Sequence, residues 1–191
     1  MPSRHRGPAL CSAALSAPCC ASEFFCIPDY WNPVTITGTL IGIEDVIFCF
    51  TVGGLLWCAA ACGSRRRYRL DLNPKRVLAR FALCLTLALV ATLALAAMRL
   101  KPMTDIVLVG LAIGAVILAA RPNMLRLAVT GAALFGPAYF LYVRAMFAFS
   151  PGYVEQWNPS GLWGPSFWSV PLDEIAWGAV TGAAWPLIAG W

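Results

Sequence analysis

Long, continuous apolar stretches constrain the fold of this chain more than any other sequence feature. They are rich in Ala and Leu and lack the apolar–polar alternation that is typical of half-buried strands. Only 12% of the residues are charged, whereas a soluble domain has about 25%. Backbone polar groups in lipid must be paired within the chain, so only helices or closed barrels span a bilayer. The sequence therefore predicts an all-α integral membrane protein.

The apolar stretches predict about five transmembrane helices, because a span needs roughly 20 residues. These helices are expected at 41–62, 77–98, 104–120, 124–149 and 170–191. Residues 1–25 differ from the rest, because the weak apolar stretch that follows Arg4 and Arg6 is interrupted by Pro18. We interpret this region as a disordered segment, a weak signal peptide or a misassigned start.

Lys and Arg residues are concentrated in a basic loop at 63–80, which follows the first expected helix. The positive-inside rule places such a loop in the cytoplasm, and with five spans the C-terminus lies there too. We therefore expect a protein of the bacterial plasma membrane, with Arg4 and Arg6 on the outer side. Because this loop explains the net charge of +5, we expect contact with membrane lipids and no nucleic acid partner.

The residue composition argues against a metal or another cofactor. The chain has eight Cys but a single His, His5, and several of the Cys lie in apolar stretches, where Cys behaves as a small apolar residue. It has no glycine-rich loop of the phosphate-binding type. We expect no metal and no cofactor.

A repeat relates two parts of the chain. Each copy has a Trp-Asn-Pro sequence, a loop that contains Gly, a pair of adjacent acids and an apolar helix. The two sets are Trp31-Asn32-Pro33 with Glu44-Asp45, and Trp157-Asn158-Pro159 with Asp173-Glu174. Both copies enter the membrane in the same direction, which predicts a parallel repeat about an axis along the membrane normal.

The repeat predicts the domain organisation. Residues 104–191 form a complete three-helix unit, and 26–62 form the remnant of a first unit, joined by the basic loop and a linker helix at 63–103. The first two helices of a tandem three-helix repeat are apparently missing. We therefore expect a homo-oligomer, or a hetero-oligomer with another small membrane subunit.

The paired acids are the candidate functional groups. Carboxylates inside a membrane are costly and are functional candidates by default, although acids in a first helical turn also favour the helix dipole and can lie among headgroups. Adjacent helical residues point about 100° apart, so one acid of each pair is expected to face the bundle. A carboxyl kept protonated in apolar surroundings acts as a general acid, and a second carboxylate stabilises a cation.

The helix starts GIEDVIF (42–48) and PLDEIAW (171–177) resemble the Pro-x-Glu-Glu/Asp motif of the lycopene cyclase domain family. Members are small membrane carotenoid cyclases of the heterodimeric or tandem-domain type. The resemblance implies four catalytic acids: Glu44, Asp45, Asp173 and Glu174. Pro171 matches the motif proline, whereas Gly42 stands in its place in the first copy, and Asp173 replaces the usual first Glu. Side chains expected to contact substrate are Phe48, Trp168, Pro171 and Trp177.

The implied activity is that of an intramolecular lyase or isomerase acting on a lipophilic polyene. A carboxylic acid protonates the end of an acyclic carotenoid, the next alkene closes the ring, and a carboxylate removes a proton. We expect Glu44 and Glu174 to be the essential acids. Three alternatives remain open at the level of the sequence: a carotenoid hydratase or long-chain carotenoid cyclase subunit, a small proton-coupled transporter, and a membrane subunit without enzymatic activity.

Overall fold

The computed structural model describes residues 3–64 and 73–191, and it confirms an all-α membrane-type architecture. Its long helices are α1 (Ser3–Ser16), α3 (Ile43–Gly63), α4 (Pro74–Ala96), α5 (Pro102–Ala120), α6 (Leu125–Phe149) and α7 (Leu172–Gly190). The short elements are η1 (Ala17–Ser22), α2 (Glu23–Cys26), η2 (Pro122–Met124), η3 (Pro151–Gln156), β1 (Ser166–Phe167) and β2 (Val170–Pro171). The two strands form one small antiparallel hairpin before α7.

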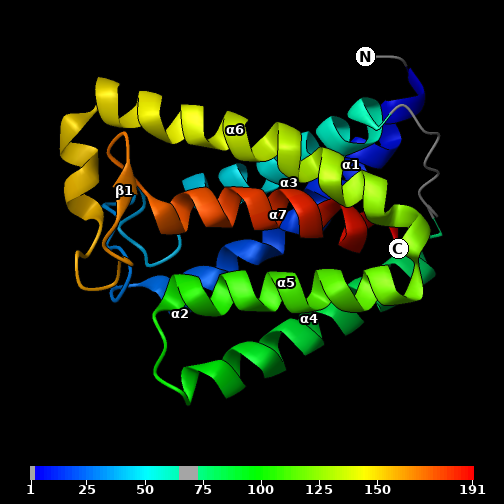
Figure 1. Ribbon diagram of the computed structural model, residues 1–191, viewed down its shortest axis with the longest axis horizontal. Helices are drawn as coiled ribbons and strands as arrows, with labels where there is room; N and C mark the ends of the chain where they lie inside the picture. The colour runs from blue at the N-terminus through cyan, green and yellow to red at the C-terminus, as the bar shows by residue number, and fades with distance from the viewer. Residues whose placement is uncertain (1–2, 65–72) are drawn as a thin grey trace.

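Five helical segments of the described residues are long and apolar enough to cross a membrane, which confirms the expected number. They are Arg6–Cys26, Ile43–Gly63, Pro74–Ala96, Pro102–Ala120 and Pro122–Phe149. The set differs from the expected one, because it contains the N-terminal segment and does not contain α7. Helix α7 lies between α5 and α6 (Figure 1) and packs against both.

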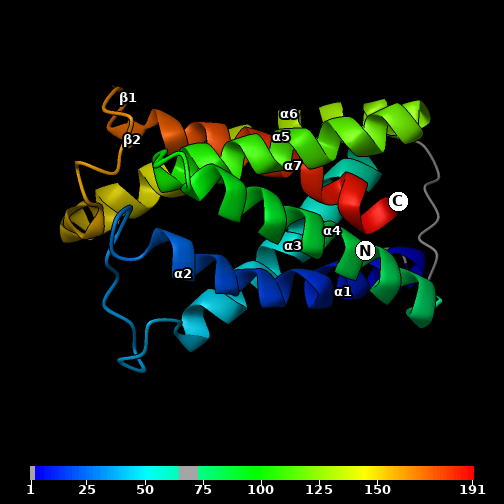
Figure 2. The same ribbon diagram turned by 90° about the horizontal axis from the view of Figure 1, so that it is seen from below.

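The N-terminal segment is helical from Ser3 to Cys26 and packs along α3, as the comparison of Figures 1 and 2 shows. Two serine hydroxyls of α1 donate to α3 carbonyls: Ser12 to Gly53 at 2.7 Å and Ser16 to Cys49 at 2.6 Å. Pro18 lies in the first turn of η1, where its missing N–H leaves no helical hydrogen bond unmade. Residues 3–25 are thus helical in the structure, and the signal-like and misassigned-start interpretations remain predictions.

The two Trp-Asn-Pro loops pair with each other. Trp31 and Trp157 form an antiparallel bridge, flanked by hydrogen bonds from Asn32 N–H to Gln156 O (2.7 Å) and from Asn158 N–H to Tyr30 O (2.8 Å). The indole rings of the two tryptophans lie 5.6 Å apart. Pairing of equivalent residues in antiparallel directions is the arrangement that a two-fold relation between the repeats requires.

Glycine contacts show which helices correspond in the two repeats. Gly182 brings α7 against α6, since a Cβ there would lie 2.8 Å from the carbonyl oxygen of Gly131. Gly53 brings α3 against α1 in the same way, since a Cβ there would lie 1.9 Å from Ser16 Oγ. Helix α1 thus packs on α3 as α6 packs on α7.

The helix ends define two ends of the bundle. At one end α1 begins, α3 ends, α4 begins and α7 ends, whereas the paired loops and the hairpin lie at the other end (Figure 1). Arg6 therefore lies at the same end as Lys75 and Arg76, not opposite them as expected from five spans. Four residues of the predicted basic loop, Arg65, Arg66, Arg67 and Arg69, lie outside the described residues.

Candidate active site

A cavity of about 270 Å³ lies at the loop end of the bundle, where α2, α3, α6 and α7 meet the paired loops. Four carboxyl side chains line it: Glu23, Glu44, Asp45 and Glu174. Most of the remaining wall is aromatic, and its rings belong to Tyr30, Trp31, Phe48, Tyr139, Tyr142, Tyr153, Trp157 and Trp177. The two repeats therefore contribute acids to one shared cavity.

Glu174 is the most extensively hydrogen-bonded of these acids. Its Oε1 accepts from the Tyr30 hydroxyl at 2.6 Å and from Trp157 Nε1 at 3.1 Å, and its Oε2 accepts from the Tyr139 hydroxyl at 2.6 Å. The side chain is only 4% exposed. An indole N–H can only donate, and a carboxylate has about four acceptor positions, so three donors suit an ionised group and leave one position free. Burial, and then the charge of Glu174, raise the pKa of Tyr30, which keeps its hydroxyl protonated as a donor.

The hairpin and Pro171 place Glu174 and direct Asp173 elsewhere. Pro171 ends β2 and precedes the first residue of α7, so both acids lie in the first turn. Asp173 is fully buried, and its Oδ2 accepts a long hydrogen bond (3.4 Å) from the backbone N–H of Trp163. Asp173 is not among the residues that line the cavity, because adjacent helical residues point about 100° apart.

The acids of α3 also divide into two environments. Asp45 is 9% exposed, and its Oδ2 accepts from the backbone N–H of Gly42 at 2.7 Å, which caps the helix. Glu44 turns back toward the preceding loop, where its Oε1 accepts from the N–H of Ile36 at 2.7 Å. A Cβ on Gly42 would lie 2.4 Å from the Glu44 carboxyl carbon. The glycine that replaces the motif proline therefore makes room for this orientation of Glu44.

The two acid pairs share one feature, although Glu44 also lines the cavity and Asp45 also accepts from a backbone N–H before its helix. The first acid of each pair, Glu44 or Asp173, accepts a hydrogen bond from a backbone N–H of the loop before its helix. The second acid, Asp45 or Glu174, is buried and lines the shared cavity. Asp45 and Glu174 are thus the equivalent acids of the two repeats.

Glu23 is a carboxyl that the sequence analysis missed. It lies in α2 and lines the cavity, and its Oε2 accepts from Trp31 Nε1 at 2.6 Å. The sequence analysis set it aside because it belongs to the region taken as atypical. Its position in an apolar helical segment could have marked Glu23 as a functional candidate, since acids in such segments are rare and costly.

Of the four side chains expected to contact substrate, two line the cavity and two do not. Phe48 and Trp177 line the cavity and stack with ring centroids 6.3 Å apart. Trp168 is 68% exposed and stacks on Phe167 outside the cavity, and Pro171 is buried in the hairpin. Sequence patterns gave no reason to single out Tyr30 or Tyr139, and they marked Trp157 only as part of the repeat, because the role of these side chains depends on which helices and loops meet.

Residues 101–191, a little under half of the chain, match a family model described as lycopene cyclase. This part of the chain is therefore similar to the lycopene cyclase family. It includes α5, α6, α7 and the acids Asp173 and Glu174, and it supports a carotenoid cyclase-type role. No curated protein and no solved structure matches the chain. Glu44 and Asp45 lie outside the matched residues but share a cavity with Glu174, which lies inside them.

Proposed function

We propose that this protein is a membrane cyclase that closes the end group of an acyclic carotenoid by proton-initiated ring formation. The observation that carries the proposal is the position of Glu174, a buried carboxylate with three donors, in one cavity with the acids of the other repeat. The cavity has a volume of about 270 Å³, which suits the end of a polyene and not its full length.

The proposed reaction conserves protons and electrons. A carboxylic acid gives its proton to the terminal double bond, and a tertiary carbocation forms. The electron pair of the neighbouring alkene attacks this carbon, so a carbon–carbon bond closes the ring and the positive charge moves to a ring carbon. A carboxylate then takes a proton from the adjacent carbon, and the new double bond forms. The product is an isomer of the substrate.

We propose different roles for the two equivalent acids. Glu174 serves as the anion in this proposal, because its three donors favour the charged form and oppose the burial that favours the neutral one. Asp45, which is also buried but accepts fewer hydrogen bonds, supplies the proton. The rings of Phe48 and Trp177 add stabilisation of the cation through their π faces. Glu44, which the sequence favoured, holds the loop before α3 in this proposal.

The reaction is tested by expression in lycopene-accumulating bacteria and chromatography of the extracted pigments. The wild-type protein is expected to convert lycopene into a ring-containing isomer, and Asp45→Asn to lose this product while Glu44→Gln retains most of it. Glu155→Gln, at an exposed position of η3, is the matched control. A hydroxylated acyclic product would favour the hydratase, and unchanged lycopene at normal protein levels would contradict both.

We also propose that the end of the bundle with Arg6, Lys75 and Arg76 faces the cytoplasm of a bacterial plasma membrane, because basic residues favour that side. The cavity then opens near the outer surface. Labelling of an added cysteine in intact cells tests this orientation: a residue added after Trp191 is expected to be protected, and its labelling from outside would contradict the proposal.

An exposed face of α3 supports the expectation that a partner subunit binds this protein. On α7, Val180 and Ala184 meet glycines of α5. The repeat places Thr51 and Leu55 of α3 at the same positions, and Leu55 is 57% exposed. We propose that a helix of a second small membrane subunit packs here. Leu55→Trp is expected to weaken an oligomer in detergent and Leu89→Trp on α4 to leave it intact; a monomeric wild-type protein would contradict the proposal.

A further inference from the structure

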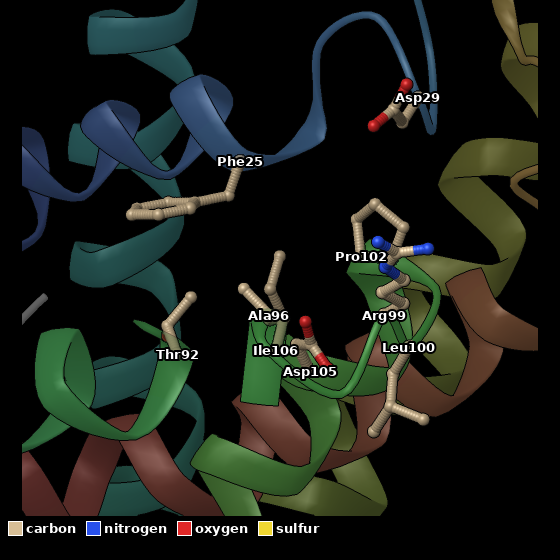
Figure 3. A pocket seen from close by; sticks show the side chains of 9 residues that line it. All are labelled: Phe25, Asp29, Thr92, Ala96, Arg99, Leu100, Pro102, Asp105 and Ile106. Atoms are coloured by element: carbon tan, nitrogen blue, oxygen red, sulfur yellow. The ribbon is translucent and has the colours of Figure 1, made fainter. Parts of the chain in front are cut away.

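A second cavity, separate from the acid cavity, lies at the same end of the bundle between α2, the end of α4 and the start of α5. Its volume is about 330 Å³. Figure 3 shows the side chains of Asp29, Arg99 and Asp105 around one opening, with Phe25 across from Arg99. Ile106 lines both cavities, so they are neighbours in the bundle.

Asp105 is the buried polar group of this second cavity. It is 5% exposed, and its Oδ1 accepts no hydrogen bond from the described residues. The helix dipole favours its charge, since it lies in the first turn of α5. The dipole does not supply the missing donor, and a buried acceptor without a donor costs about 1–3 kcal/mol. The carboxylate therefore suits a ligand that brings N–H donors and a positive charge.

Arg99 gives the same cavity a positive charge, opposite to that of the Asp105 carboxylate. It belongs to the turn between α4 and α5 and has a left-handed backbone with φ 55°. In the described part of the chain, neither Arg99 nor Asp29 has an ion-pair partner. A guanidinium binds phosphate well because its planar donors match the phosphate oxygens. The cavity thus offers a cation site and an anion site to one dipolar ligand.

The surroundings of the cavity suit a lipid as the ligand. Phe25, Leu100 and Ile106 form its apolar wall, and α4 continues from it with outward-facing leucines such as Leu93, which is 55% exposed. The opening lies where two candidate spans, α4 and α5, end and begin. Headgroups lie at this level of a bilayer, and acyl chains could follow the exposed face of α4.

We propose that this cavity binds a primary ammonium group linked to a phosphate, as in the headgroup of an ethanolamine phospholipid. The ammonium donates to Asp105, with Asp29 nearby, and the phosphate accepts from Arg99. A trimethylammonium headgroup has no N–H and cannot donate a hydrogen bond to the Asp105 carboxylate. The site therefore discriminates between ethanolamine and choline lipids, and it does so independently of any cyclase activity.

Native mass spectrometry of the purified full chain in detergent tests the site. Phosphatidylethanolamine and phosphatidylcholine with identical acyl chains are added in competition. The wild-type protein is expected to prefer the ethanolamine lipid by about tenfold, the effect of one charge-assisted hydrogen bond. Asp105→Asn is expected to abolish the preference, and Arg99→Gln to weaken binding of both lipids.

Two control variants lie at the same end of the bundle outside the cavity, Glu155→Gln and Arg144→Gln, and both are expected to keep the preference. Equal binding of the two lipids by the wild-type protein would overturn the proposal, as would a preference that survives Asp105→Asn. Soluble phosphoethanolamine provides a third arm. If soluble phosphoethanolamine competes only weakly with the ethanolamine lipid, the result supports the lipid as the ligand. If it displaces the lipid at equal concentration, the site binds a soluble compound, and the proposal of a lipid ligand is overturned.

Discussion

Replacing Glu174 with Gln removes one negative charge from the acid cavity and leaves its shape unchanged. The amide oxygen can occupy the position of Oε1 and accept from Tyr30 and Trp157, as the carboxylate does. The amide nitrogen then takes the position of Oε2 and donates to the Tyr139 hydroxyl, which can turn its hydrogen away. All three contacts are retained, so we expect Glu174→Gln to fold and to reach the membrane at wild-type levels.

The size of the effect follows from the burial of the carboxylate. Glu174 is 4% exposed, so water screens its charge only weakly. At an effective dielectric constant of about 20, opposite unit charges about 4 Å apart attract by about 4 kcal/mol. If this attraction acts on the carbocation and not on the neutral substrate, its loss slows ring closure about a thousandfold.

The assay is the rate of cyclic pigment formation in lycopene-accumulating cells, normalised to the amount of protein in the membrane. Asp173→Asn is the matched control, because it removes the same charge from the adjacent residue, which does not line the cavity. We expect Asp173→Asn to retain far more activity than Glu174→Gln. Equal losses in the two variants would refute the argument, because the effect would then not depend on the cavity.

Two predictions concern glycines. Gly53→Ala is expected to destabilise the protein by about 1–3 kcal/mol, because its Cβ would lie 1.9 Å from Ser16 Oγ; thermal unfolding in detergent measures this, and Gly54→Ala, whose nearest contact is 3.4 Å away, should cost less. Gly42→Ala is expected to displace the Glu44 carboxyl, which a Cβ would approach to 2.4 Å, with little loss of cyclic pigment. A loss as large as that of an acid substitution would instead make Glu44 a reacting group.

The acid pairs show how far sequence reasoning reached. The spacing of adjacent acids at a helix start predicts that only one of them faces the bundle, and Glu174 lines the cavity whereas Asp173 does not. On α3 both acids line the cavity, and the sequence favoured Glu44 over Asp45. Helical geometry gives the angle between two side chains, but the rotation of the helix within the bundle decides which of them points inward.

The N-terminal segment shows the opposite case. Pro18, the Cys residues and the weak apolar character of 1–25 indicated disorder or processing, yet residues 3–25 belong to helices packed on α3. Serine hydroxyls and Gly53 make this close contact possible. Such a contact depends on a partner surface more than 30 residues away, so the local sequence of α1 did not reveal it.

The sequence by itself determined the membrane character, the approximate number of spans, the repeat and the acid pairs, because these depend on local composition and on spacing along the chain. Only the tertiary structure decided that Glu23 joins the cavity and that three donors surround Glu174. Those donors come from the first loop, from α6 and from the second loop, and Tyr30 is 144 positions away from Glu174. Contacts over such separations are fixed by the packing of whole helices, which no local pattern specifies.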